Sequence, residues 1–212
     1  MTTENLIREP EHPGREPDNP GSRDLRCRIL AIAERLFRDL GYRKTTVADI
    51  AADLRMSPGN VYRFFPSKKA LNEAVAARLL AGIEAELRAI ATRPGVPAPQ
   101  RLREFLVTLH SRSAQQFTAN RRMHEMVEVA MAESWDVVHC HIGAVDRMLC
   151  RLVAEGAEAG EFDVADPMAA ARCVHAAFVR FCHPALIAQC ADEAGPTLDE
   201  MIAFVLAGLR AR

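Results

Sequence analysis

The chain has 212 residues, enough for one large domain or two small ones, and either choice leaves a real hydrophobic core. Ala, Leu, Arg and Glu dominate, whereas aromatic and β-branched residues are sparse, so the composition predicts an all-α fold. No run approaches the roughly 18 uninterrupted apolar residues of a membrane span, and the N-terminus lacks the pattern of a secretory signal. We therefore expect a cytoplasmic protein with no membrane partner.

Charge is distributed unevenly along the chain. The formal net charge of −1 taken alone argues against a nucleic-acid partner, because binding to phosphates needs a basic surface. However, residues 21–70 carry eleven Lys and Arg against five Asp and Glu, a net charge of +6, while residues 1–20 carry −3 and residues 71–212 carry −4. One basic module within an acidic chain indicates a nucleic-acid partner.

The first elements are a tail and a helix. Residues 1–21 are rich in proline and acidic residues and poor in apolar ones, so we expect a flexible tail. A helix is predicted from Ser22 or Asp24 to Leu40, because apolar residues recur there every three to four positions. Gly41 then supplies a left-handed stop.

Three capped helices are predicted next. Thr46, or its neighbour Thr45, begins a capping box that opens a short second helix. Ser57 can cap a third helix over residues 58–65, with a proline at its first position. Ser67 follows a proline break and can cap a long fourth helix, residues 68–91.

The remainder of the chain is predicted to be a second helical unit. The segment Thr92–Pro99, with three prolines and a glycine, is predicted to be a hinge between the N-terminal module and the rest. Five more helices are expected near residues 100–118, 121–131, 134–159, 166–190 and 197–211. Pro184 should kink the 166–190 helix or end it early.

The second and third helices have the layout of a helix-turn-helix, in which the second helix enters the major groove of DNA. Val61 and Phe65, one turn apart, should face inward and hold the third helix to the second. The other residues of the third helix are then available to DNA: Gly59, Asn60 and Arg63 at base edges, and Tyr62 at a backbone oxygen or a thymine methyl. Arg63 suits guanine and Asn60 suits adenine.

Residues at the helix starts complete the candidate site. Lys68 and the amides around it can converge on one phosphate, and Thr46 can do the same on the other side, with Ser57 at the start of the third helix. The alternative is that these are ordinary caps and surface residues of a helical bundle. Their joint occurrence at fixed offsets favours DNA binding.

The run from Ile29 to Leu71 resembles the DNA-binding domain of the TetR family of regulators. The resemblance is carried by Leu40-Gly41-Tyr42, Thr45-Thr46 with Ile50-Ala51, and Gly59-x-Val61-Tyr62-x-x-Phe65-x-Ser67-Lys68. It implies a DNA-binding domain at residues 22–68 and a helical domain for ligand binding and dimerisation at residues 69–212. It also implies that Thr46, Gly59, Asn60, Tyr62 and Lys68 occupy DNA-contacting positions.

The resemblance further implies a homodimer that binds a palindromic operator, usually as a repressor, and releases it when a small-molecule effector fills a pocket among the C-terminal helices. One residue departs from the family pattern. Phe64 stands where His or Tyr is common, and a phenyl ring cannot donate a hydrogen bond to a phosphate oxygen. Lys69, where an acid is frequent, adds a charge that can compensate.

The C-terminal half offers candidates for an apolar effector site and a dimer seam. The candidate ligand-binding residues are Phe105, Met123, Met126, Trp135 and Phe178, although packing in the core is the default interpretation of each. An alanine-rich helix over 166–190 and a final helix bearing Met201, Phe204, Val205 and Leu209 can form a four-helix dimer seam. The alternative is that both helices pack within the monomer.

Clusters of histidine and cysteine raise the alternative of a metal- or redox-responsive regulator: His139-Cys140-His141, Cys173 with His175, and Cys182-His183. Adjacent helical residues point about 100° apart, and no pair has the spacing to converge on one ion. We therefore expect no metal and no cofactor, and six reduced cysteines. An enzyme is not expected, because the chain has no nucleophile elbow, glycine-rich phosphate loop or HExxH motif.

Overall fold

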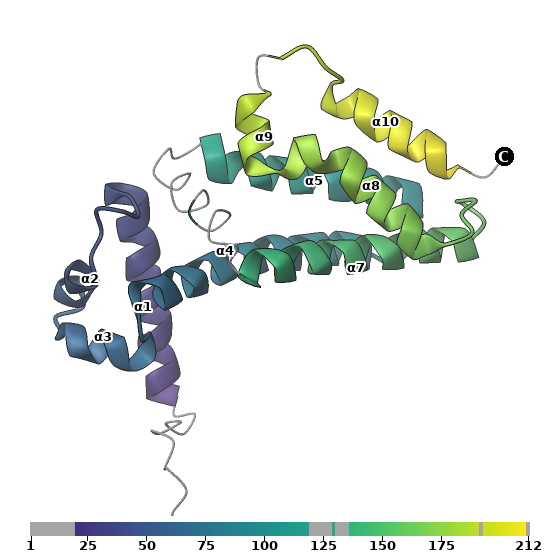
Figure 1. Ribbon diagram of the computed structural model, residues 1–212. Coiled ribbons are helices and arrows are strands. Elements are labelled where there is room, and N and C mark those ends of the chain that lie inside the picture. The colour runs from purple at the N-terminus through teal and green to yellow at the C-terminus, as the bar shows by residue number, and fades with distance from the viewer. Residues whose placement is uncertain (1–19, 119–128, 130–135, 191–192, 211–212) are drawn as a thin grey trace, which may run out of the picture.

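The computed structural model describes residues 20–118, 129, 136–190 and 193–210. These ranges hold nine helices: α1 (Pro20–Leu40), α2 (Val47–Asp53), α3 (Pro58–Phe64), α4 (Lys68–Ala91), α5 (Ala98–Thr118), α7 (Asp136–Glu158), α8 (Pro167–Cys182), α9 (Pro184–Gln189) and α10 (Leu198–Leu209) (Figure 1). The predicted all-α fold is confirmed, and the one β contact within these ranges is an isolated bridge between Phe162 and Arg210. None of the described helices combines the length and hydropathy that a membrane crossing requires.

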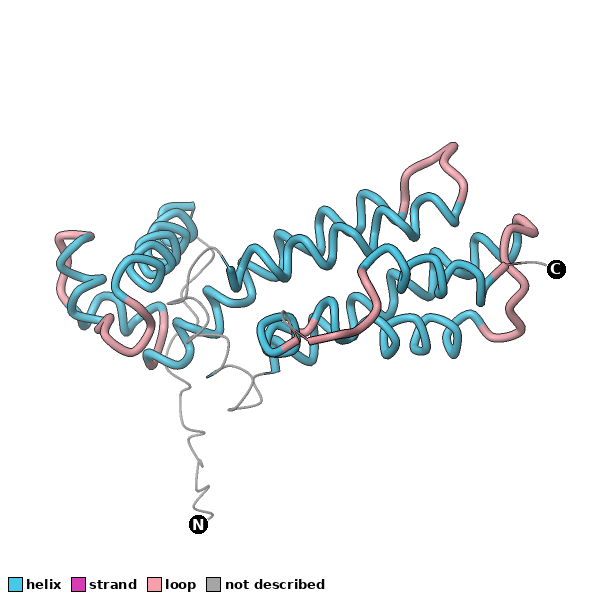
Figure 2. Tube along the Cα trace, turned by 90° about the horizontal axis from the view of Figure 1, so that it is seen from above, coloured by secondary structure: helices cyan, strands magenta, loops and turns pink. Residues whose placement is uncertain are grey.

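The helices build two hydrophobic clusters at opposite ends of the molecule. In both views α1–α3 lie at one end, and α5, α7, α8 and α10 lie at the other (Figures 1 and 2). The N-terminal cluster is formed by buried residues of α1–α3 and the start of α4: Ile29, Leu30, Ala33, Leu36, Phe37, Val47, Ile50, Ala51, Val61, Phe65, Leu71, Val75 and Ala76. The C-terminal cluster takes its buried residues from the second half of α4 and from α5, α7, α8 and α10, and it contains Phe105, Phe178 and Phe181.

Helix α4 belongs to both clusters. Leu71 and Val75 are fully buried in the N-terminal cluster, whereas Leu87, four turns later, is fully buried in the C-terminal cluster. The segment Thr92–Pro99, predicted as a hinge between two units, instead joins the end of α4 to the start of α5 within the C-terminal cluster. That prediction is wrong because proline and glycine mark any turn between helices, while the change of core takes place inside an unbroken helix.

The local signals for helix ends are mostly confirmed. Gly41 has a φ of 94° and ends α1, and Ser67 caps α4 by accepting a hydrogen bond from the amide of Ala70 at 3.0 Å. Helix α1 begins at Pro20, before both predicted starts, Ser22 and Asp24, with proline in the first helical position where its missing N–H costs nothing. Pro184 ends the predicted 166–190 helix, since α8 stops at Cys182 and α9 begins at Pro184.

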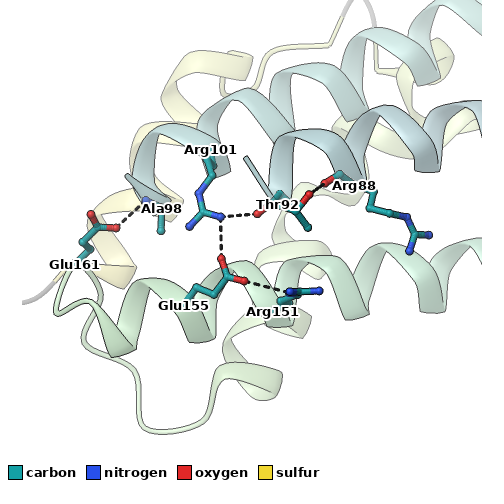
Figure 3. Close-up of polar contacts among 8 residues, drawn as sticks. Arg88, Thr92, Ala98, Arg101, Arg151, Glu155 and Glu161 are labelled. Atoms are coloured by element: carbon teal, nitrogen blue, oxygen red, sulfur yellow. Dashed lines mark hydrogen bonds and ion pairs between the residues drawn. The ribbon is translucent and has the colours of Figure 1, made fainter. Parts of the chain in front are cut away.

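A polar cluster closes the end of the C-terminal half that is remote from α1–α3 (Figure 3). Arg101 of α5 is only 8% exposed, and its guanidinium donates to the carbonyl of Ala91, at the end of α4, and to Glu155 of α7 at 2.8 Å. Glu161 accepts a hydrogen bond from the amide of Ala98 at 2.7 Å and so satisfies the start of α5. The arginine lowers the pKa of Glu155, which keeps the pair ionised and ties α4, α5 and α7 together.

Candidate nucleic-acid interface

The two threonines before α2 have separate tasks. Thr45 is fully buried, and its hydroxyl lies 2.9 Å from the carbonyl oxygen of Gly41 and 3.2 Å from that of Leu36, which fixes the end of α1. Thr46 is the N-cap: its Oγ1 accepts from the amide of Asp49 at 3.1 Å, and its own amide donates to the Asp49 carboxylate at 2.8 Å. The predicted capping box is confirmed, and it leaves Thr46 exposed at the start of α2.

The carboxylate of Asp49 is held in its ionised form by this box. The hydrogen bonds from the amide and hydroxyl of Thr46 lower the pKa of Asp49, and the charge of Lys68 acts in the same direction. The Thr46 hydroxyl donates to Asp49 Oδ2 at 2.7 Å. Without DNA, therefore, the polar hydrogens of Thr46 are used within the helix start.

Helix α3 has one buried and one exposed face. Val61 is fully buried and Phe65, just after the helix, is 3% exposed, as predicted for the residues that hold α3 against α2. The guanidinium of Arg26 on α1 lies 4.8 Å from the centre of the Phe65 ring, a cation–π contact that further fixes this end. The opposite face is exposed and contains Ser57, Gly59, Asn60, Tyr62 and Arg63, with Tyr62 47% exposed.

At α3 the predicted side-chain cap is absent, and the residue that departs from the family pattern is partly buried. Ser57 occupies the N-cap position with an extended backbone, but its side chain makes no capping hydrogen bond, so its hydroxyl is not committed to the helix start. Phe64, which departs from the family pattern, is half-buried and packs against the N-terminal cluster. Part of the Phe64 ring is therefore buried against the N-terminal cluster, and the rest is exposed to solvent.

Gly59 is the second residue of α3, and because it has no side chain it exposes the helix backbone to solvent at this position. A Cβ atom built on Gly59 would meet nothing closer than the Ser57 hydroxyl at 3.8 Å, an ordinary van der Waals distance. The fold itself therefore has room for a side chain here. A bare backbone on an exposed face is what a close approach to another molecule requires.

Lys68, at the start of α4, is bound to the loop between α1 and α2. Its ammonium donates to the carbonyl of Tyr42 at 2.8 Å and to that of Arg43 at 3.4 Å, and it lies 4.8 Å from the centre of the Tyr42 ring. Burial lowers the pKa of Lys68. These contacts anchor α4 beside the helix-turn-helix, a task that the spacing of residues did not reveal because the partner lies 26 positions earlier.

The predicted ligand residues are only partly within the described ranges. Phe105 and Phe178 are both fully buried in the C-terminal cluster. Met123, Met126 and Trp135 lie outside the described residues.

Two histidines of the C-terminal half are bound to carboxylates of neighbouring helices. His141 of α7 lies 2.9 Å from Glu84 of α4, and His175 of α8 lies 2.6 Å from Asp146 of α7, each through Nδ1. Among the described residues no three side chains of the types that ligate metals come together. Sequence reasoning missed both pairs because the partners are 57 and 29 positions apart.

Helices α8 and α10 carry exposed apolar residues. Phe204 of α10 is 71% exposed and Val179 of α8 is 42% exposed. Small residues accompany them on the same exposed faces: Ala169, Cys173 and Ala176 on α8, and Ala203, Ala207 and Gly208 on α10. Exposed apolar faces of this kind are typical of surfaces that another protein covers.

Comparison with known proteins gives matches over most of the chain. The family described as "Bacterial regulatory proteins, tetR family" matches residues 29–75, and the family described as "Tetracyclin repressor-like, C-terminal domain" matches residues 98–201. Among curated proteins the search finds no match.

Several solved structures are similar in fold. The reduced form of NemR from E. coli has 16% sequence identity and a TM-score of 0.64, with 89% of this chain and 97% of that chain covered. SmeT, the repressor of the multidrug efflux pump SmeDEF of Stenotrophomonas maltophilia, has 22% identity and a TM-score of 0.62 over 88% and 90% of the two chains. RolR in complex with resorcinol has 19% identity and a TM-score of 0.60 over 90% of each chain.

Proposed function

Because the chain belongs to the TetR family of transcriptional regulators, we propose that it is a homodimeric, ligand-responsive repressor of a palindromic operator. Regulators of this family bind DNA and generally have no enzymatic activity. The observation that carries the proposal is the division of α3 into two faces. Val61 and Phe65 are buried and hold the helix in place, while Gly59, Asn60 and Arg63 are exposed to solvent.

The exposed residues of this interface have different roles in the proposal. Asn60 and Arg63 read base edges in the major groove, because an amide suits adenine and a guanidinium suits guanine. Ser57 and Tyr62 contact the sugar–phosphate backbone of the DNA around these bases, and Thr46 does so when its hydroxyl turns from Asp49 to a phosphate oxygen. Lys68 has three ammonium hydrogens and directs two of them at the carbonyls of Tyr42 and Arg43, so one is available to a phosphate oxygen.

A second copy of the chain completes the repressor in this proposal. The exposed apolar faces of α8 and α10 are the surface for it, since Phe204 at 71% exposure is costly to leave in water. A two-fold dimer with this seam presents two copies of α3. They would enter successive major grooves about 34–36 Å apart, which requires a palindromic operator.

The effector site of the proposal lies among the helices of the C-terminal cluster, and its ligand is small and apolar. Phe105 and Phe178 are the described candidates for its lining, and their full burial means that an effector must displace packed side chains to reach them. Helix α4 provides the coupling, because Leu87 packs in the C-terminal cluster while Leu71 packs in the N-terminal one. A shift of α4 caused by the effector would change the position of α3 relative to the α3 of the second subunit. The complex of RolR with resorcinol and the link of SmeT to a multidrug pump describe those proteins and support a small-molecule effector here.

Footprinting of the DNA that flanks the gene for this protein tests the proposal. We expect protection of a palindrome that disappears as salt is raised, because phosphate contacts release counterions. Protection should also weaken on addition of a compound that raises the thermal stability of the protein. The absence of any salt-sensitive protection would overturn the proposal.

A further inference from the structure

The turn between α2 and α3 contains an unusual backbone conformation. Arg55 has a φ of 55°, in the left-handed region, and its amide donates to the carbonyl of Ala52 at 3.0 Å. Every other described residue with a positive φ is a glycine: Gly41, Gly95 and Gly160. Glycine adopts this conformation without a steric penalty, whereas the Cβ of an arginine crowds the neighbouring carbonyl oxygen.

The fold itself gains no contact from the Arg55 side chain. The side chain is exposed, and within the described part of the chain it makes no hydrogen bond or ion pair. Arg35 on α1 offers a contrast, because its guanidinium bonds to Asp53 of α2 at 2.7 Å and links the two helices. A strained residue without a stabilising contact in the free protein indicates a contact made elsewhere.

The location of the turn indicates what that contact is. Arg55 comes two residues before the N-cap Ser57, so it lies in the turn that leads into α3 and its exposed residues Gly59 and Asn60. A helix whose N-terminal end enters the major groove has the phosphates of the groove edge on its flank. A planar guanidinium binds a phosphate through two parallel hydrogen bonds.

We propose that Arg55 is a phosphate-binding residue that strengthens the grip on duplex DNA of any sequence, at the expense of backbone strain in the turn. The proposal rests on the DNA-binding function proposed above. It assigns Arg55 to affinity and not to sequence choice, in contrast to Asn60 and Arg63.

Four variants test the role of Arg55 in the full-length protein. Arg55→Gly removes the strain and the charge, Arg55→Asn removes the charge but tolerates the left-handed backbone, and Arg55→Lys keeps the charge. Arg88→Ala is the matched control, because Arg88 is an exposed arginine on the second half of α4 (Figure 3), far from α3. Binding is measured by fluorescence anisotropy across a salt series, with the footprinted operator duplex and with a random duplex of equal length.

We expect Arg55→Gly and Arg55→Asn to weaken binding to both duplexes by a similar factor, about tenfold at low salt. The slope of log K against log salt should become shallower by about 0.9, the loss of one phosphate contact. Arg55→Lys should restore the slope, Arg88→Ala should leave it unchanged, and Arg55→Gly should melt no lower than the natural protein.

Other results would overturn the inference. A wild-type slope in Arg55→Gly, or an equal change in Arg88→Ala, would mean that Arg55 touches no phosphate. A lower Tm in Arg55→Gly would mean that the arginine serves the fold. If the natural protein itself binds neither duplex in a salt-sensitive way, the proposed function fails and not merely the role of Arg55.

Discussion

Replacing Gly59 by alanine should raise the stability of the protein while lowering its affinity for DNA. Glycine within a helix is about 0.5–1 kcal/mol less favourable than alanine. The new Cβ would have the Ser57 hydroxyl as its nearest neighbour at 3.8 Å, so no clash offsets this gain. Because Gly59 is in the first turn of α3, we expect about 0.5 kcal/mol, or a rise in Tm of about 1–2 °C.

The effect on DNA binding should have the opposite sign. The same Cβ stands on the exposed face of α3, where the proposal brings the helix backbone against the groove. A methyl group forced into a close contact costs about 1–3 kcal/mol, so operator affinity should fall by a factor of about 5 to 150. Gly82→Ala is the matched control, because Gly82 is an exposed glycine in the middle of α4 whose Cβ would meet nothing within 4 Å.

Thermal unfolding followed by circular dichroism measures the first effect, and anisotropy with a labelled operator duplex measures the second. Gly82→Ala should gain stability and bind DNA as the natural protein does. The reasoning is refuted if Gly59→Ala binds the operator with unchanged affinity, or if it loses stability.

Four further substitutions probe the interface, the dimer and the core. Lys68→Ala should weaken binding to operator and random DNA by similar factors, whereas Asn60→Ala should reduce the ratio of the affinity for the operator to the affinity for random DNA. Equal effects of the two variants on this ratio in an anisotropy assay would contradict their assigned roles. Phe204→Glu should convert a dimer to a monomer in light scattering after size-exclusion chromatography, since it replaces a phenyl ring that is 71% exposed in the monomer by a charged carboxylate; an unchanged mass would place the seam elsewhere. Gly156→Ala should lower the free energy of unfolding in urea by about 1–3 kcal/mol, because the added Cβ would press on the Phe162 ring and lie 2.8 Å from the Cβ of Ala98; an unaltered urea midpoint would show that the ring moves aside freely.

The features that sequence reasoning predicted well are local ones. Thr46 with Asp49, Gly41, and Ser67 before α4 each act on neighbours within about one turn of helix. Capping chemistry of this range is visible in a short stretch of sequence. The division of α3 into a buried face with Val61 and an exposed face with Asn60 follows in the same way from helical spacing.

The features that were missed depend on contacts between distant parts of the chain. The ammonium of Lys68 binds the carbonyl of Tyr42, which lies 26 positions earlier in the chain, and His141 binds Glu84, which lies 57 positions earlier. Nothing in the composition of α4 marks the place where one core ends and the other begins. The left-handed Arg55 was missed for a different reason, because only glycine or asparagine normally signals such a turn.

The sharing of α4 by the two clusters also determines how this protein can be dissected. A fragment cut at Lys68 would lack Leu71, Val75 and Ala76, and the helix-turn-helix would lose one wall of its core. A chimera that transfers the operator preference to another regulator must therefore join the two parents inside a helix, beyond Ala76. There a single inserted residue turns the downstream face by about 100°, so the two parents must be joined in helical phase.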